Sequence, residues 1–305
     1  MLDEGKFVAS RRNQHLRQVK LYAGIMKPSV DLIVVTHNSG SVLPMFLETV
    51  PSGANIVVVD NASADDSAAI AEAAGAKLIE IDENVGYGSA CNVGAAAGDA
   101  PFLLFANPDV RFEAGAVEAL LASATAYPAA AFNPRFFSGA RRRFRRWSRL
   151  LPASDFWHGA PPDHDCAIPV LHGACIFIKR EHFERVGGFD QKIFLFHEDD
   201  DLSIRLLQAG IELRLAAKAV VDHAEGRSSA RSTESGRIKG EAMGRSLVYV
   251  MDKHRMPLDV PAERYRTWLK LLWPHVLFSS ARRSKLLGFV NGLNGGPMNS
   301  LGKRQ

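Results

Sequence analysis

The chain has 305 residues, 47% of them hydrophobic and 23% charged, which predicts a globular protein with one sizeable core. The net charge of +4 is mildly basic, and the three cysteines, Cys91, Cys166 and Cys175, form no CxxC pair, so neither a disulfide framework nor a structural zinc site is expected. No apolar run approaches the roughly 18–20 residues that span a bilayer, and the N-terminus shows no secretory signal, so we expect a cytoplasmic protein.

Strands and helices alternate regularly after a polar extension at residues 1–28. Apolar runs such as DLIVV at 31–35 predict buried strands, and the i, i+3, i+4, i+7 stripe within 43–50 predicts a helix. Ser63 followed by Asp66 resembles a capping box that opens another helix. Such alternation argues for a doubly wound, mainly parallel sheet. The expected strands are 31–35, 56–59, 77–81 and 101–105, and the expected helices are 43–50, 63–74 and 88–97.

The pattern loosens beyond residue 128. Residues 138–170 are rich in Arg, Pro, His and Asp, and we expect a long loop or insertion there. Regular patterns then return and predict strands at 174–179, 193–196 and 212–221, and helices at 181–187, 199–209 and 232–252.

Polar side chains follow each of the first four expected strands. Asn, Asp and Ser are common in such turns and cap the next helix, which is the plainer interpretation of any single loop. Four such loops at one edge of a parallel sheet favour a ligand site instead. The chain has no GxGxxG after the first strand and no P-loop motif, so a single nucleotide fits better than a dinucleotide. These loops contain THNS at 36–39, DNAS at 60–63, DENVGYG at 82–88 and NPD at 107–109.

Four consecutive carboxylates occupy residues 198–201, at the start of an expected helix. The helix dipole explains one or two acidic residues there, but not four. Crowding of like charges raises the proton affinity of a carboxylate, which suits a general base. Asp201 and Arg205 are spaced to form an i, i+4 ion pair.

Two basic stretches stand out. The segment 141–149 contains six arginines with Phe144 and Trp147 between them, and it predicts contact with nucleic acid, with anionic lipid headgroups or with a diphosphate, or else a solvated loop. In the tail, an apolar stripe with cations opposite is typical of an interfacial membrane helix, although a helix packed on the catalytic domain is the alternative. That stripe consists of Tyr265, Trp268, Leu269, Leu272 and Trp273.

The ordered set of motifs resembles family-2 glycosyltransferases of the GT-A fold, in particular the bacterial rhamnosyltransferase-like branch. The motifs are VDLIVVTHNSG, VVVDNAS, ENVGYGSACNVGAAA, FLLFANPDV, LHGACIFIKREHFERVGGFDQ, FLFHEDDDLSIRL and VVDHAEG. The resemblance implies an α/β catalytic domain at 29–230, preceded by an extension at 1–28 and followed by a helical, basic region at 231–305.

The resemblance also implies roles for matching positions. Asn107-Pro108-Asp109 stands in place of the DXD motif, in which a carboxylate holds Mg²⁺ or Mn²⁺ against the donor diphosphate. Because the first position is Asn107, the expected metal affinity is weakened; Asp109 and His223 are the expected metal ligands, although a hydrogen-bonded strand-end histidine is the alternative for His223. The expected donor-binding residues are Thr36, Asn38, Asp60, Asn61, Asn84, Gly86, Asn92 and Asn107.

On the acceptor side, the resemblance implies that Asp199 is the general base. Glu198 and Asp201 would position the acceptor or fix the nearby backbone. Gly173 and Ala174 would leave room for the acceptor sugar, although a glycine at the entry of a strand is equally common.

Together these features predict an inverting glycosyltransferase that uses a nucleotide-diphosphate sugar, such as dTDP-rhamnose or a UDP-sugar, and a bacterial glycan acceptor that is lipid-linked. The tail would attach it to the inner face of the plasma membrane. Three alternatives remain: a nucleotidyltransferase, which would need a glycine-rich basic loop after the first strand; a nucleic-acid-binding protein, which leaves residues 198–201 unexplained; and an inactive scaffold, which only Asn107 supports. We expect no nucleic-acid partner.

Overall fold

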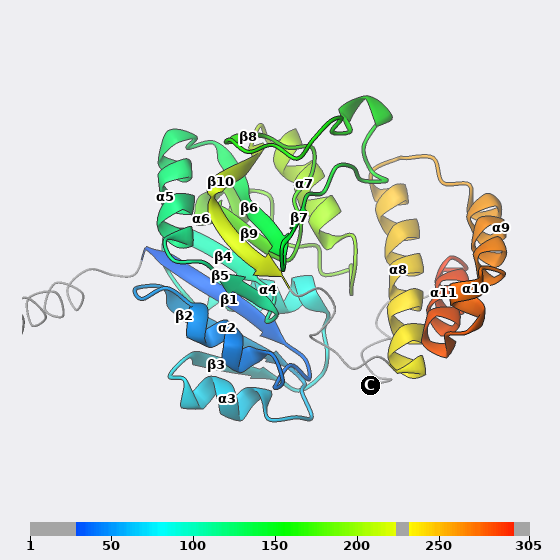
Figure 1. The fold of residues 1–305 in the computed structure, drawn as a ribbon, viewed down its shortest axis with the longest axis horizontal. Coiled ribbons are helices and arrows are strands. Elements are labelled where there is room, and N and C mark those ends of the chain that lie inside the picture. The colour runs from blue at the N-terminus through cyan, green and yellow to red at the C-terminus, as the bar shows by residue number, and fades with distance from the viewer. Residues whose placement is uncertain (1–28, 224–231, 296–305) are drawn as a thin grey trace, which may run out of the picture.

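One sheet forms the body of the protein, and helices cover both of its faces (Figure 1). The computed structural model describes residues 29–223 and 232–295, so the expected extension at 1–28 and the expected domain boundary at 230–231 lie outside the described residues. The strand order is β3-β2-β1-β4-β9-β6-β10-β5, with β7 beside β6 and β8 beside β10. The strands are β1 (Val30–Thr36), β2 (Asn55–Asn61), β3 (Lys77–Ile81), β4 (Phe102–Ala106), β5 (Val110–Phe112), β6 (Ala130–Ser138), β7 (Arg141–Arg143), β8 (Cys166–Ala167), β9 (Cys175–Lys179) and β10 (Glu212–His223).

The first half of the sheet is parallel, as the alternation of elements predicts. β1 pairs in parallel with β2 and β4, and β2 pairs in parallel with β3. Leu32 and Val34 of β1 enter one core cluster, while Ile33 and Val35 enter the cluster on the opposite face. Both faces of this strand are therefore buried, which explains its unbroken apolar sequence.

The second half of the sheet is mixed. β9 is antiparallel to both β4 and β6, and β5 is antiparallel to β10. β10 runs parallel to β6 with a register shift between Ala216 and Val220. The antiparallel strands bring segments 107–112 and 172–175 to the carboxyl ends of the parallel strands, where the expected site lies.

Most expected helices are present, but the expected capping box is wrong. α3 begins at Ser67. The Ser63 hydroxyl does not cap this helix, because it donates to Asp60 Oδ1 (2.5 Å) in the preceding loop. The Ser67 N–H donates instead to Asp65 Oδ1 (3.1 Å). The helices are α2 (Leu43–Thr49), α3 (Ser67–Ala73), α4 (Tyr87–Ala96), α5 (Ala116–Ala126), α6 (Arg180–Arg185), α7 (Glu198–Gln208), α8 (Thr233–Lys253), α9 (Val260–Leu271), α10 (Pro274–Leu277) and α11 (Ser280–Gly292), with a 3₁₀ turn, η1, at Ala153–Asp155.

Two expectations for the middle of the chain need correction. The expected loop at 138–170 contains β7, which forms a hairpin with β6, and β8, which pairs with β10. The expected strand at 193–196 is irregular, and it ends in Phe196 and His197, which have φ angles of 67° and 65°. Left-handed backbone at two successive non-glycine residues is strained and is often found at functional sites.

The C-terminal helices stand beside the body of the sheet, beyond α7 (Figure 1). α8 and α11 approach so closely that a Cβ placed on Gly240 would lie 1.9 Å from the Lys285 carbonyl oxygen, and one on Gly288 would lie 2.2 Å from the Arg237 carbonyl oxygen. Small residues at spacings of four allow such backbone contact. Across 29–223 and 232–295, no helix combines the length and the apolar character needed to cross a membrane.

The apolar stripe of α9 faces outward. Leu272 is 68% exposed and Trp268 is 51% exposed, whereas Glu263 and Thr267, on the other side of the helix, are buried. The stripe itself therefore does not pack on the catalytic domain, whereas the opposite side of α9 does contact it through the ion pair of Glu263 with Arg149.

Candidate active site

The loops after β1 and β2 are tied together by a buried carboxylate. Thr36 Oγ1 donates to Asp60 Oδ1 (2.7 Å), and the Ser63 N–H donates to Asp60 Oδ2 (2.9 Å). Asn38 has a φ angle of 54°, and its Oδ1 accepts from the Ala64 N–H (2.8 Å). Thr36, Asn38 and Asp60 thus lie together at the end of the parallel strands, with only Asn38 exposed.

The next loop is shaped by a pair of buried amides. Asn61 Nδ2 donates to Asn84 Oδ1 (2.9 Å), and Asn84 Oδ1 also accepts from the Gly86 N–H (3.0 Å). Gly86 has a φ angle of 88°, and a Cβ there would lie 2.1 Å from the Phe194 carbonyl oxygen. This position therefore requires glycine, and the loop after β3 is pressed against the segment that leads into α7.

Asn92 lies apart from these residues. Its Nδ2 donates to the Phe189 carbonyl oxygen (2.8 Å), and its Oδ1 accepts from the Phe189 N–H (2.9 Å). Its amide is committed to holding the turn at Gly188, which has a φ angle of 68°. Asn92 thus orders the backbone behind the site and is not grouped with the other expected donor-binding residues.

The expected metal ligands meet at the junction of β5 and β10. The antiparallel register places His223 opposite Val110, and His223 Nε2 lies 3.2 Å from Asp109 Oδ1. Both side chains are buried. The Asn107 N–H donates to the Ala174 carbonyl oxygen (2.9 Å), which ties this end of the site to the segment before β9.

This donor set is compatible with a divalent cation. A carboxylate oxygen and an imidazole nitrogen at adjacent positions are ordinary ligands of Mn²⁺, and carboxylates suit Mg²⁺. Within the described part of the chain, no cluster of three or more His, Cys, Asp or Glu side chains is arranged to hold a metal. Among the described residues, Asp109 and His223 supply two ligands, and a bound molecule such as a diphosphate can supply others.

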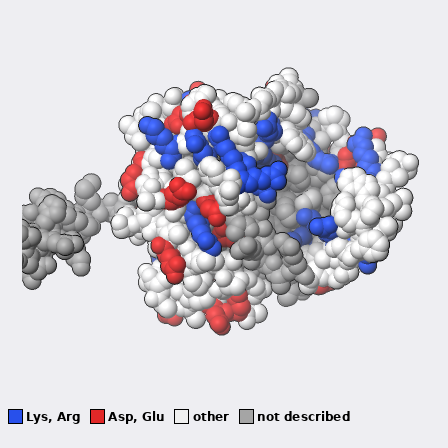
Figure 2. All heavy atoms as spheres, viewed as in Figure 1, with Lys and Arg blue, Asp and Glu red and all other residues white. Residues whose placement is uncertain are grey.

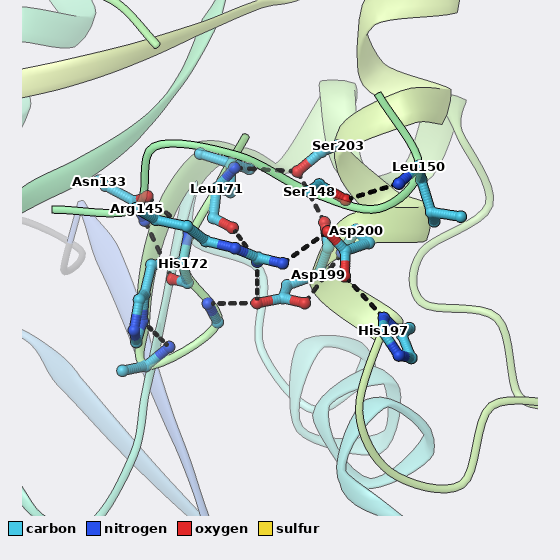
Figure 3. Close-up of polar contacts among 12 residues, drawn as sticks. Asn133, Arg145, Ser148, Leu150, Leu171, His172, His197, Asp199, Asp200 and Ser203 are labelled. Carbon is cyan, nitrogen blue, oxygen red and sulfur yellow. Dashed lines mark hydrogen bonds and ion pairs between the residues drawn. The ribbon is translucent and has the colours of Figure 1, made fainter. Parts of the chain in front are cut away.

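Asp199 is fixed from two sides at the start of α7 (Figure 3). Its Oδ2 accepts from the Gly173 N–H (2.8 Å) and from Arg145 Nη1 (2.7 Å), while Arg145 Nη2 donates to Asp200 Oδ1 (2.6 Å). A Cβ on Gly173 would lie 3.0 Å from Asp199 Oδ2, so a larger residue there would crowd this carboxylate. Ala174, beside it, is buried at the start of β9.

Glu198 and Asp200 differ sharply in their electrostatic surroundings. Burial, together with the negative charge of Asp199, raises the pKa of Glu198 to about 8. Its Oε2 has no hydrogen-bond partner among the described residues. Burial opposes ionisation of Asp200 as well, but His197 and Arg145 together hold its pKa well below the usual range. At neutral pH the cluster is therefore less charged than its sequence indicates.

Asp201 points away from the other carboxylates and joins two helices. It is fully buried, its Oδ2 accepts from Arg205 Nε (2.8 Å), and its Oδ1 lies 2.8 Å from His254 Nε2 and 2.6 Å from Lys253 Nζ. The expected ion pair with Arg205 is confirmed. Asp201 connects α7 to α8 and does not face the cavity at Asp199.

That cavity has a volume of about 350 Å³ and contains a histidine that sequence reasoning missed. His172 lines it together with Asp199, Arg145, Phe144 and Arg143. Burial lowers the pKa of His172 to about 4, so the ring is neutral. The Ala174 N–H donates to His172 Nδ1 (3.2 Å), which leaves the proton on Nε2. In the sequence, the position of His172 directly before Gly173 was the signal that could have identified it.

Arg145 was also missed, because it is one of six arginines in its segment. Its neighbours secure the same segment: Arg142 Nη1 donates to the Pro161 carbonyl oxygen (3.1 Å), Arg146 donates to the Gly159 carbonyl oxygen, and Arg149 Nη1 pairs with Glu263 (2.9 Å). Basic side chains gather between the sheet and the C-terminal helices, whereas acidic side chains lie mostly toward the left and lower edges of the view (Figure 2). Arg142, Arg146 and Arg149 thus make contacts within the protein.

Lys239 of α8 is a third missed residue. Burial and the nearby positive charge of Lys285 lower its pKa, while the negative charge of Asp109 acts in the opposite direction. Lys239 of α8 is therefore near enough to Asp109 for the two charges to interact, so this C-terminal helix borders the expected metal ligands.

Two sequence families match the chain. The family described as "Glycosyl transferase family 2" matches residues 31–187, and the family described as "N-terminal domain of galactosyltransferase" matches residues 160–225. An N-acetylglucosaminyl-diphospho-decaprenol L-rhamnosyltransferase of Mycobacterium tuberculosis is 28% identical over 69% of this chain and 80% of its own length. An uncharacterised glycosyltransferase of Mycobacterium bovis is 33% identical over 31% of this chain and 43% of its own length.

Solved structures share the fold. The mannosyltransferase PcManGT from Pyrobaculum calidifontis, in complex with GDP-Man and Mn²⁺, aligns with a TM-score of 0.57 and 16% identity over 88% of each chain. GalNAc-T7 with UDP, GalNAc and Mn²⁺ aligns with a TM-score of 0.54 and 15% identity over 64% of this chain and 43% of its own. At these identities the likeness concerns the fold alone.

Proposed function

Because the chain belongs to glycosyl transferase family 2 and has the GT-A fold, we propose that it is an inverting transferase that moves a sugar from a nucleotide-diphosphate donor to a diphospho-polyprenol-linked glycan. L-Rhamnose from dTDP-rhamnose is the first candidate for the transferred sugar, since the mycobacterial relative that matches over 80% of its length is a rhamnosyltransferase with a lipid-linked acceptor. The main support for the proposal is the position of Asp199, which lines the cavity and is held by Gly173 and Arg145.

The chemical step follows from the position of that carboxylate. Asp199 lines the cavity and is held in one orientation by Gly173 and Arg145. It accepts the proton of an acceptor hydroxyl while the hydroxyl oxygen forms a bond to the anomeric carbon of the donor. The bond from that carbon to the diphosphate breaks on the opposite side, the electron pair leaves with the diphosphate, and the anomeric configuration inverts.

Neutral His172 is suited to orient the acceptor. Its Nε2–H can donate to an acceptor oxygen without adding a positive charge beside Asp199. Protonated Glu198 limits the repulsion between the carboxylates of the cluster.

The donor is proposed to lie over the ends of β1, β2 and β4. Thr36, Asn38 and Asp60 would bind its base and ribose, with Asn61, Asn84 and Gly86 shaping the loop beneath. Asn107, Asp109 and His223 would face its diphosphate. Mg²⁺ or Mn²⁺ bound there would offset the charge that develops on the leaving diphosphate. Asn107 contributes no charge, so affinity for the ion rests on Asp109.

A membrane surface is the proposed location of the acceptor. The outward stripe on α9, with Tyr265 (66%), Trp268 (51%) and Leu272 (68%) exposed, is suited to the interface of the inner leaflet, where cations on the same helix would meet anionic headgroups. The protein would then be peripheral at the cytoplasmic face of the plasma membrane.

Product formation tests the proposal. The protein is incubated with Mn²⁺, N-acetylglucosaminyl-diphospho-polyprenol and, in separate reactions, dTDP-rhamnose, UDP-sugars and GDP-sugars, and products are identified by mass spectrometry. We expect one donor to give a glycosylated lipid. Asp199→Asn should lower kcat by about 10²–10⁴, whereas Asp163→Asn, at an exposed residue, should not. Equal turnover by wild type and Asp199→Asn would contradict the assignment of the base.

A further inference from the structure

Three cavities form a connected row from Asp199 to the C-terminal helices. The first is the cavity of about 350 Å³ at Asp199 and His172. The second, of about 370 Å³, shares Phe144 and Arg145 with the first. The third, of about 380 Å³, shares Arg149 and His197 with the second. The row is therefore continuous in its lining residues and joins the catalytic centre to the tail.

The chemical character of the row changes along its length. The first two cavities are lined mainly by polar, basic and aromatic side chains. The third is lined by apolar residues of α8, α10 and α11, with basic side chains among them. The apolar residues are Met243, Leu247, Trp273, Val276, Leu286 and Phe289, and the basic residues include Lys270, Arg282 and Lys285.

Lys285 lines the third cavity on the side of the polar linings. Its Nζ lies 5.5 Å from the centre of the Phe196 ring, and Phe196 directly precedes His197, which lines both the second and the third cavity. Burial lowers the pKa of Lys285, and no carboxylate in the described ranges forms an ion pair with it. By contrast, Arg149 is neutralised by Glu263. A half-buried ammonium group without a carboxylate partner favours a mobile anion.

The third cavity adjoins the exposed apolar surface of the tail. Trp273 lines the cavity and is 51% exposed, and Leu277 and Phe278, at the end of α10, are 48% and 90% exposed. An apolar chain leaving the cavity would therefore meet exposed apolar side chains.

We infer that the row binds a polyprenyl-diphosphate-linked acceptor, with the sugar at Asp199 and His172, the diphosphate at Lys285 and the first isoprene units in the cavity between α8 and α11. This inference rests on the proposed transfer to a lipid-linked acceptor and assigns the residues that recognise the carrier. The order of apolar, cationic and catalytic linings matches the order of chain, diphosphate and sugar in such a molecule.

Calorimetry with farnesyl diphosphate, farnesol and inorganic diphosphate tests the inference. Saturating nucleoside diphosphate and Mn²⁺ are present throughout, so that the donor site is filled. We expect farnesyl diphosphate to bind at least about tenfold more tightly than either of the other two probes. Lys285→Ala should weaken it about tenfold or more, because a charge-assisted contact is lost. Trp273→Ala should also weaken it, without changing the affinity for inorganic diphosphate.

Arg264→Ala is the matched control, since Arg264 is an exposed cation of the tail that does not line the cavity. Equal effects of Lys285→Ala and Arg264→Ala would overturn the inference in favour of general attraction to anions. Failure of farnesyl diphosphate to bind, while the nucleotide binds, would overturn the inference and leave the transferase function standing. Failure of the nucleotide to bind would instead count against the proposed function.

Discussion

At the scale of single residues, the account depends on how one aspartate is held among four carboxylates. Asp200 is ionised and paired, Asp201 is buried in contacts between helices, and Glu198 retains its proton at neutral pH. Asp199 alone among them both lines the cavity of about 350 Å³ and is fixed by Gly173 and Arg145. This separation of roles explains how four adjacent acids can coexist.

Arg145 is predicted to position Asp199 rather than to touch the substrate. Arg145→Met should lower kcat by about 10–100-fold, because a carboxylate that is out of position accepts the acceptor proton less efficiently. The affinity for nucleotide should stay the same. Arg145→Lys should restore part of the activity, since a cation remains near the carboxylate. Steady-state kinetics with parallel nucleotide titrations measure both quantities.

Arg141→Met is the control for that experiment, because Arg141 belongs to the same arginine-rich segment and is exposed. A loss of activity as large in Arg141→Met as in Arg145→Met would mean that the charge of the segment matters and not the contact with Asp199.

Glu198 makes a prediction about stability and pH. Its folded-state pKa of about 8 lies above the ordinary value of 4.5, so the unfolded chain ionises first as pH rises. The stability that Glu198 contributes is present below pH 4.5 and is lost between pH 4.5 and 8, by up to about 1.4 kcal/mol per pH unit. Glu198→Gln does not ionise, so its melting temperature relative to wild type should increase across this window and level off above it.

Thermal melts from pH 4 to 9 measure this difference. Glu118→Gln, at an exposed residue of α5, should follow wild type at every pH. If the difference in melting temperature between Glu198→Gln and wild type stays constant from pH 4.5 to 8, Glu198 does not retain its proton in the folded protein.

At the scale of secondary-structure elements, the contact between α8 and α11 positions Lys285 and the apolar cavity. Gly240→Val should destabilise this pair by about 1–3 kcal/mol, because its side chain would overlap the Lys285 carbonyl oxygen of α11. The melting temperature and the protease sensitivity of the tail measure the effect. Asp252→Val introduces the same side chain on an exposed face of α8 and should cost much less. Equal losses would show that the close contact does not stabilise the tail.

The sequence predicts the parallel half of the sheet well, because strands such as β1 are buried on both faces and leave an unbroken apolar pattern. It does not predict the short strand β7 or the irregular segment before α7. β7 is three residues long and lies in a run of arginines without apolar alternation, so the local pattern does not reveal its hairpin with β6. The irregular segment depends on the contact between Gly86 and the distant Phe194, which a local pattern does not contain. The role of Arg145 could not be predicted for the same reason, since Asp199 and Asp200, which it contacts, lie 54 and 55 residues away along the chain.

At the scale of the whole molecule, we propose that the catalytic sheet and the tail form one binding surface for the lipid-linked acceptor. Leu272→Glu should weaken binding to vesicles of anionic phospholipid about tenfold, since it places a charge in the exposed apolar stripe. Nucleotide affinity should not change. Leu207→Glu, at an exposed site on α7, is the matched control. Cosedimentation measures the bound fraction, and equal binding by Leu272→Glu and wild type would rule out the stripe as the membrane contact.

The most direct test of the account is a calorimetric titration of UDP, dTDP and GDP, with and without Mn²⁺, on wild type and on Asp109→Ala. The account predicts that one nucleotide binds in the presence of Mn²⁺ and that Asp109→Ala weakens it at least about tenfold, because the carboxylate beside His223 is lost. Binding of none of the three nucleotides under either condition would contradict the central claim that this protein is a nucleotide-sugar-dependent transferase.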